Sequence, residues 1–257
     1  MQPQITETLT LPMPDGQSVR GIINYMPQSQ PTPVVVFAHG FGSTRMGEKS
    51  LALEAECARR GWAFAACDFR AHGASDGTMT ELRGSRLLED LDAITRAAVQ
   101  RAGGPLFLVG SSMGGWASAW FAAQHPDRVT ACAFVAPGFR FLEFLRLNDE
   151  ERQAWQRTDR LRVQNEFIDL EISYGLVAEA EKFAFAELTQ AFRTPSILFH
   201  GMADDIVPYE ISLAFAAACQ TNLLQVWLSK DGDHRLSNKT AWLAKETCDF
   251  FTRHVSA

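Results

Sequence analysis

The chain has 257 residues, of which 46% are hydrophobic and 21% are charged, and its formal net charge is −6. A chain of this length can bury about three quarters of the surface that it would expose when unfolded, so we expect a single domain over residues 1–257. The negative charge and the lack of a basic stripe exclude nucleic-acid binding as a main role. No apolar run approaches the roughly 18–20 residues that a membrane span requires.

The cysteines and the amino terminus indicate a compartment. Five cysteines form no Cys-x-x-Cys pair, and several lie inside apolar segments. Buried free thiols in an odd number are typical of a reducing compartment. The first basic residue is Arg20, so the start of the chain resembles neither a signal peptide nor an Arg-rich transit peptide. We expect cytoplasmic residence, and the sequence leaves a monomer and a homodimer both open.

Strand-like and helix-like segments alternate along the chain. Strands at residues 5–11 and 19–25 flank a turn at 14–16 and are predicted to form an antiparallel hairpin at one edge of a sheet. The alternation predicts an α/β fold, with a mostly parallel twisted sheet of about eight strands and helices on both faces. Further strands are predicted near residues 33–38, 62–67, 105–110, 129–135, 195–199 and 223–228, and helices near 47–60, 84–102, 113–124, 208–219 and 238–254.

The most informative segment has the sequence Gly-Ser-Ser-Met-Gly at residues 110–114, between an apolar strand and an Ala-rich helix. This setting is typical of a nucleophile elbow, in which only very small residues fit two positions before and after the serine. Ser112 fits this pattern, whereas Ser111 would need a glycine in place of Val109. The turn would raise the Ser112 hydroxyl above the sheet edge, at the positive end of the following helix.

A serine hydroxyl is a weak nucleophile and needs a base and an acid that orients the base. In this fold class the three groups follow in the order serine, acid, histidine. Asp204 follows the strand at 195–199, and His234 follows the strand at 223–228. All three residues fall beyond the carboxyl ends of strands, where open α/β sheets place their sites. The sequence therefore predicts a catalytic triad of Ser112, His234 and Asp204.

Together these segments resemble the α/β-hydrolase superfamily over nearly the whole chain. Residues 39–43 are similar to its oxyanion-hole loop, and residues 68–77 are similar to its D-x-R-G-x-G-x-S-x-G segment, with Ala71 in place of a glycine. Residues 110–116 and 200–208 are similar to a narrower branch. That branch includes the mammalian mycophenolic acid acyl-glucuronide esterase, also described as a palmitoyl-protein thioesterase, and the likeness does not transfer a substrate.

The resemblance implies roles for individual residues. Asp204 stands at the acid position of the family's H-G-x-x-D segment, whereas its neighbour Asp205 is expected to cap the helix that starts near Pro208. The backbone N–H groups of Phe41 and Met113 would form the oxyanion hole.

One block, residues 138–194, shows no convincing strand, and its composition is helical at 149–162 and 176–190. Its position matches the cap insertion of the superfamily, so we expect a small helical cap within the single domain. Most of its aromatic residues should pack the cap onto the core. Some would line an apolar substrate pocket. The sequence does not choose among them, and the candidates include Phe139, Phe141 and Tyr174.

The remaining motifs argue against a metal and a cofactor. His39 and His200 each end a strand and precede a glycine, and we expect backbone hydrogen bonds to satisfy them. A zinc site of His39, His200 and Asp68 would lack any H-x-x-x-H spacing. Residues 40–45 begin like a dinucleotide fingerprint, but Arg45 replaces the last glycine.

The leading interpretation is a serine hydrolase that cleaves small carboxylic esters through an acyl-enzyme on Ser112. Its partner would be a small-molecule acyl ester or thioester. A thioesterase or an acyl-glucuronide esterase is the nearest alternative. Two further classes stay open: an acyltransferase or perhydrolase with the same triad, and a non-catalytic binding protein on a hydrolase scaffold.

Overall fold

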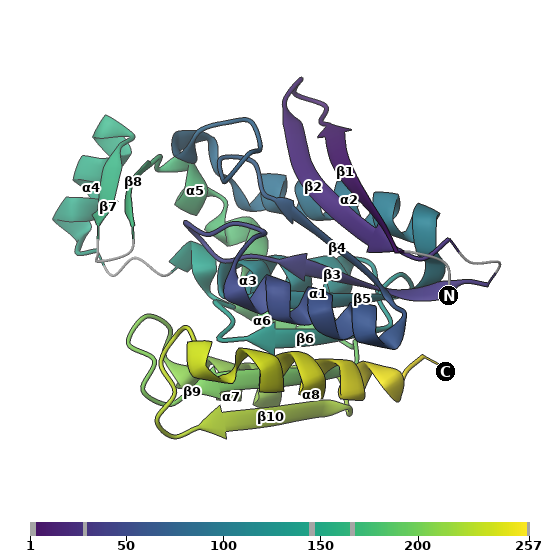
Figure 1. The fold of residues 1–257 in the computed structure, drawn as a ribbon. Coiled ribbons are helices and arrows are strands. Elements are labelled where there is room, and N and C mark those ends of the chain that lie inside the picture. The colour runs from purple at the N-terminus through teal and green to yellow at the C-terminus, as the bar shows by residue number, and fades with distance from the viewer. Residues whose placement is uncertain (1–3, 28–29, 144–146, 165–167, 256–257) are drawn as a thin grey trace.

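The computed structural model describes residues 4–27, 30–143, 147–164 and 168–255. Their centre is an eight-stranded sheet with the strand order β1-β2-β4-β3-β5-β6-β9-β10 (Figure 1). The pairs β1–β2 and β2–β4 are antiparallel and every other neighbouring pair is parallel, so the predicted hairpin does form one edge. The strands are β1 (Ile5–Pro12), β2 (Ser18–Tyr25), β3 (Thr32–Ala38), β4 (Ala63–Asp68), β5 (Gly103–Ser111), β6 (Ala131–Val135), β9 (Ser196–Gly201) and β10 (Leu224–Ser229).

Helices cover both faces of the sheet, as predicted (Figure 1). Successive side chains of a strand point to opposite faces, and β3 shows this clearly. Val34 and Val36 belong to the core on one face, whereas Val35 and Phe37 belong to the core on the other. The first face is covered by α2 (Gly84–Ala102), α3 (Met113–Gln124) and α7 (Tyr209–Ala218), and the second by α1 (Glu48–Arg60) and α8 (Thr240–Thr252).

Between β6 and β9 the chain leaves the sheet, and Figure 1 shows part of this insertion beyond the carboxyl ends of the strands. It contains α4 (Asp149–Thr158), β7 (Leu161–Gln164), β8 (Asp169–Ile172), α5 (Gly175–Ala178) and α6 (Phe185–Ala191). The antiparallel pair β7–β8 corrects the expectation of a purely helical cap. Each of its strands has only four residues, which is too short for an alternating pattern to stand out from a loop. Short 3-10 turns occupy Met79–Glu81, Phe141–Glu143, Ala180–Phe183 and Ser237–Lys239.

A hydrogen-bonded glutamate ties the insertion to the body of the protein. Glu179 accepts hydrogen bonds from the backbone N–H of Ser85 at 2.9 Å and from its hydroxyl at 2.8 Å, at the start of α2. Within the insertion, the Trp155 indole donates to the carbonyl of Ile172 at 3.3 Å, and its ring is buried. Most described aromatics of this block are buried in the core, as predicted. Phe144 and Phe167 lie outside the described residues.

Among the helices that the structure describes, none combines the length and the hydrophobicity of a membrane-spanning segment. The five cysteines are free thiols, and four of them are buried. The expectation of cytoplasmic residence stays a prediction.

Candidate active site

Ser112 occupies a strained turn between β5, which ends at Ser111, and α3, which begins at Met113. Its φ of 52° and ψ of −115° lie in a region that residues with a side chain rarely adopt. Backbone hydrogen bonds hold the turn: the Ser112 N–H donates to Val135 O at 3.1 Å, and the Ser112 carbonyl accepts from Gly138 N at 2.9 Å. The predicted elbow is therefore present in the backbone.

Close backbone packing explains the two glycines of the elbow. A Cβ at Gly110 would lie 2.3 Å from the carbonyl oxygen of Gly114, and a Cβ at Gly114 would lie 2.0 Å from that of Ala38. Such distances cannot be relieved by a rotamer change, because the opposing atoms belong to the backbone. The strand–turn–helix unit can form only if both positions lack a side chain.

The structure brings the three predicted triad residues together from the ends of three strands. The Ser112 Oγ lies 3.2 Å from His234 Nε2, and His234 Nδ1 lies 2.8 Å from Asp204 Oδ2. Asp204 follows β9, and His234 follows β10. The Asp204 side chain has no exposed surface, whereas His234 exposes 21% of its side chain. His234 thus lies between the serine hydroxyl and the carboxylate, as expected for a base that the acid orients.

The carboxylate of Asp204 is fully engaged in hydrogen bonds. Its Oδ1 accepts from the backbone N–H groups of Ile206 at 2.9 Å and Val207 at 2.8 Å. Its Oδ2 accepts from His234 and also from His200 Nε2 at 3.0 Å. Burial alone would raise the pKa of Asp204, but the hydrogen bonds from His200, His234 and Val207 outweigh it and hold the pKa well below its usual range. The group is thus a carboxylate across the neutral pH range.

Two expectations about neighbouring residues are wrong. Asp205 does not cap α7, because Pro208 occupies the N-cap position and no side chain bonds the helix start. His200 is not satisfied by the backbone alone. It bonds the carboxylate of Asp204 and the hydroxyl of Ser212 besides Val207 O.

The loop that follows β3 lies directly beside the serine. A Cβ at Gly40 would lie 3.3 Å from Ser112 Cβ, so a side chain at residue 40 would crowd the serine. The turn at Gly42 is held by the loop after β4, because the Gly42 N–H donates to His72 Nε2 at 3.2 Å. Phe41, between these two glycines, is thereby placed at the edge of the site, and Met113 begins the helix on the other side of Ser112.

Two buried histidines support this loop in their neutral form. His39 accepts from the Phe69 N–H at 3.0 Å through Nε2, and its Nδ1 lies 2.8 Å from the Gly40 carbonyl. Burial, together with the nearby His72, lowers the pKa of His39 to about 3. For His39, the expected backbone partners are confirmed. Among the described residues, no group of three potential ligands is arranged to hold a metal ion.

The insertion contacts the same loop from above. A Cβ at Gly42, which has a φ of +66°, would lie 2.5 Å from Ile168 Cγ2 and 3.5 Å from Leu170 Cδ1. The ring of Phe141 lies 5.9 Å from that of Phe41. Ile168, which precedes β8, Leu170 of β8 and Phe141 at the start of the insertion therefore form an apolar wall next to the loop after β3.

The other two candidate pocket aromatics pack elsewhere. The ring of Phe139 stacks on Phe215 at 3.9 Å and belongs to the core. The ring of Tyr174 lies edge-on to Trp155 at 5.3 Å inside the insertion. Of the three candidates, Phe141 is the one whose ring contacts Phe41.

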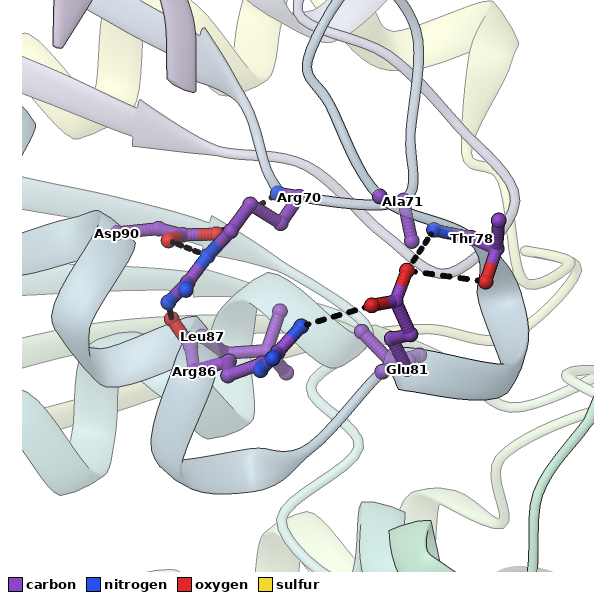
Figure 2. Close-up of a pocket in the computed structure, with 9 residues that line it drawn as sticks. Arg70, Ala71, Thr78, Glu81, Arg86, Leu87 and Asp90 are labelled. Carbon is purple, nitrogen blue, oxygen red and sulfur yellow. Dashed lines mark hydrogen bonds and ion pairs between the residues drawn. The ribbon is translucent and has the colours of Figure 1, made fainter. Parts of the chain in front are cut away.

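A small hollow under the loop after β4 is separate from this site, and no triad residue lines it. Figure 2 shows that charged groups close it: Arg70 Nε lies 2.7 Å from Asp90 Oδ1, and Glu81 accepts from the Thr78 N–H at 2.8 Å. Burial raises the pKa of Asp90 to about 6, against the opposing effect of Arg70. This network fixes the segment that carries His72.

Comparison with known proteins identifies the family. A family model described as Hydrolase_4, serine aminopeptidase S33, matches residues 29–146. Mouse palmitoyl-protein thioesterase ABHD10, mitochondrial, is 31% identical over 216 residues, which are 81% of this chain and 71% of that protein. The human protein of the same name is 30% identical over 81% of this chain and 69% of its own length.

Solved structures agree with these matches. Mouse alpha/beta hydrolase domain-containing protein 10 superposes with a TM-score of 0.82 at 26% identity, over 96% of this chain and 99% of that one. Est1E from Butyrivibrio proteoclasticus with bound ferulic acid gives a TM-score of 0.85 at 18% identity, over 97% and 100%, and this likeness concerns the fold alone. The chain belongs to the α/β-hydrolase superfamily of serine hydrolases, together with palmitoyl-protein thioesterase ABHD10.

Proposed function

We propose that this protein hydrolyses carboxylic esters or thioesters of small molecules through an acyl-enzyme on Ser112. One observation carries the proposal: His234 bridges the Ser112 hydroxyl and the buried Asp204 carboxylate, at 3.2 Å and 2.8 Å. A serine becomes a useful nucleophile when a base within hydrogen-bonding reach removes its proton and an acid orients that base. The three groups supply these parts.

In the acylation step, the Ser112 Oγ forms a bond to the acyl carbon while its proton moves to His234 Nε2. The carbon–oxygen or carbon–sulfur bond to the leaving group then breaks, and the leaving group takes that proton. The Asp204 carboxylate holds the Nδ1–H of His234 throughout and stabilises the imidazolium. Water then attacks the acyl-enzyme by the same route, with His234 again as the base.

The negative charge on the acyl oxygen needs donors that are already in place. We assign this role to the backbone N–H groups of Phe41 and Met113. Gly40 brings the first of these residues next to the serine, and the second is the first residue of α3. Loss of one such donor typically lowers the rate about 10²–10³-fold.

The acyl or leaving group would contact the apolar wall above the loop after β3, formed by Phe141, Ile168 and Leu170. This wall favours an apolar or aromatic group over a charged one. The relatives are named palmitoyl-protein thioesterases, which makes a thioester the second substrate to test. Residues 138–194 are proposed as the cap of a single catalytic domain.

The test combines labelling with turnover. Wild type and Ser112→Ala are treated with a fluorophosphonate probe and examined by intact-protein mass spectrometry. Both are also assayed on nitrophenyl esters of graded acyl length and on acyl thioesters. We expect one probe adduct on the wild type, none on the variant, and loss of turnover in the variant.

The outcomes separate the alternatives. Absence of labelling in folded wild type would support a binding protein on a hydrolase scaffold and contradict the proposal. Faster consumption of ester when an alcohol or peroxide acceptor is added would indicate an acyltransferase or perhydrolase with the same triad. A higher kcat/KM for thioesters than for esters of equal chain length would assign thioesters as the substrate class.

A further inference from the structure

A second histidine shares the acid of the site. His200, the fifth residue of β9, has a side chain with no exposed surface. Its Nε2 lies 3.0 Å from Asp204 Oδ2 and 2.9 Å from the carbonyl oxygen of Val207. Its Nδ1 lies 2.7 Å from the hydroxyl of Ser212, a fully buried residue of α7. One carboxylate oxygen of Asp204 thus faces two imidazole rings.

The partners of His200 fix the place of its proton. Both groups that face Nε2, a carboxylate and a carbonyl, can only accept, so Nε2 carries a hydrogen. In a neutral ring Nδ1 is then an acceptor, and the Ser212 hydroxyl donates to it. In a cationic ring Nδ1 would also donate, and the buried Ser212 proton would lose its one hydrogen-bond acceptor among the described residues. The arrangement therefore selects the neutral ring with hydrogen on Nε2.

We propose that His200 is a positioning residue that holds the Asp204 carboxylate for His234 while adding no positive charge of its own, a proposal that rests on the function proposed above. The Oδ1 atom is fixed by the N–H groups of Ile206 and Val207, and the His200 N–H fixes Oδ2. The plane of the carboxylate is then set before His234 bonds to it. Because His200 is neutral, the negative charge of Asp204 stays available for the imidazolium that forms during acylation.

Charged residues near Asp204 come from α1 and from the segment that carries His234. Lys49 on α1 interacts electrostatically with Asp204, and also with Asp233 and Arg235, which flank His234. From α7 only the uncharged Ser212 bonds His200. These charges are the same in every variant at position 200, so a change in kcat or in the pH profile relative to the wild type can be assigned to residue 200.

The test compares His200→Phe with His200→Gln. Phenylalanine fills the space and removes the donor, whereas the glutamine amide can restore an N–H toward Asp204. For His200→Phe we expect kcat to fall roughly ten-fold or more, the value of one hydrogen bond to a charged group, with little change in KM. Without the His200 donor the carboxylate is less well oriented, which lowers kcat, but its charge is no longer shared, so it favours the His234 imidazolium more strongly and the acid limb of the kcat/KM profile moves to higher pH. His200→Gln should recover most of kcat and the wild-type limb.

These outcomes distinguish a positioning role from a structural one. If His200→Phe lowers only the urea midpoint and keeps the wild-type kcat and acid limb, the proposal is overturned. Failure of wild type to label with the fluorophosphonate probe would overturn the proposed function instead. A phenylalanine variant that still labels on one site but turns over slowly, with a shifted limb, supports both.

A second measurement needs no variant. Nitrogen-15 NMR of histidine-labelled wild type reports which ring nitrogens carry hydrogen. We expect His200 to show a protonated Nε2 and an unprotonated Nδ1 across the pH range of activity. A doubly protonated ring in that range would overturn the proposal even if the phenylalanine variant did not fold.

Discussion

A Cβ at Gly42 would lie 2.5 Å from the Cγ2 atom of Ile168, so the insertion rests directly on the loop beside Ser112. Gly42 also has a φ of +66°, which favours glycine. We expect Gly42→Ala to displace the neighbouring Phe41 N–H and to lower kcat/KM by about 10²-fold, the usual effect of losing one oxyanion donor. Steady-state kinetics on a nitrophenyl ester would measure it.

Two further variants separate steric contact from backbone strain. Adding Ile168→Ala to Gly42→Ala removes the opposing methyl group and should recover part of the activity. Gly16→Ala, at a φ of +84° where the added Cβ would have no atom within 4 Å apart from its chain neighbours, is the control for strain alone. It should reduce stability and leave kcat/KM close to that of the wild type. Equal kinetics for Gly42→Ala and Gly16→Ala would contradict this account.

The strained backbone of Ser112 predicts a difference between two inactive variants. Ser112→Ala keeps a side chain at a φ of 52°, whereas Ser112→Gly can adopt this conformation without strain. The strain of about 1–3 kcal/mol exceeds the extra unfolded-state entropy of glycine, about 0.5–1 kcal/mol. We therefore expect a higher free energy of unfolding for the glycine variant in urea titrations. A more stable alanine variant would show that the turn stores no strain.

The choice between the two adjacent aspartates can be tested with a matched pair. Asp204→Asn places an amide where Oδ2 must accept from His234 and His200, and it should reduce kcat roughly 10⁴-fold through a misoriented base. Asp205→Asn alters an exposed side chain and should keep a kcat close to that of the wild type. The ratio of the two kcat values is the measurement. A large loss in Asp205→Asn with activity retained in Asp204→Asn would reverse the assignment.

The strands of the sheet could be predicted because both faces of the sheet are covered. Each inner strand, such as β5, is then a continuous apolar run that local composition reveals. The nearness of Ser112, Asp204 and His234 followed from one rule, that the carboxyl ends of parallel strands meet at one edge. Each prediction needed only a local pattern, namely an apolar strand and the residues that directly follow it.

The features that were missed depend on contacts between distant segments. The pair β7–β8 is stabilised by packing, with the Trp155 indole bonded to the carbonyl of Ile172, and its own sequence is too short to predict it. The bond from His200 to Ser212 requires the chain to turn between β9 and α7. A strand-ending histidine before a glycine gave no sign of that partner. The signal that could have revealed it was a polar residue, Ser212, in the first turn of the mostly apolar helix α7.

The buried neutral His39 predicts how stability depends on pH. Burial lowers its pKa from 6.5 to about 3 in the folded protein, so the unfolded chain binds the proton more readily. The contribution of His39 to stability is therefore complete above pH 6.5 and is lost as the pH falls toward 3. His72, whose pKa burial also lowers, acts in the same direction.

The measurement is the free energy of unfolding by urea at several values between pH 7.5 and 4.5, for wild type and His39→Gln. Glutamine does not titrate, so this variant should start less stable at neutral pH and lose less stability on acidification. One titrating group changes the free energy of unfolding by at most about 1.4 kcal/mol per pH unit. The wild-type plot of this free energy against pH should therefore be steeper than that of His39→Gln by up to this amount. Parallel curves would mean that His39 takes up its proton without opening the fold, through a rearrangement that frees Nε2 from the Phe69 N–H.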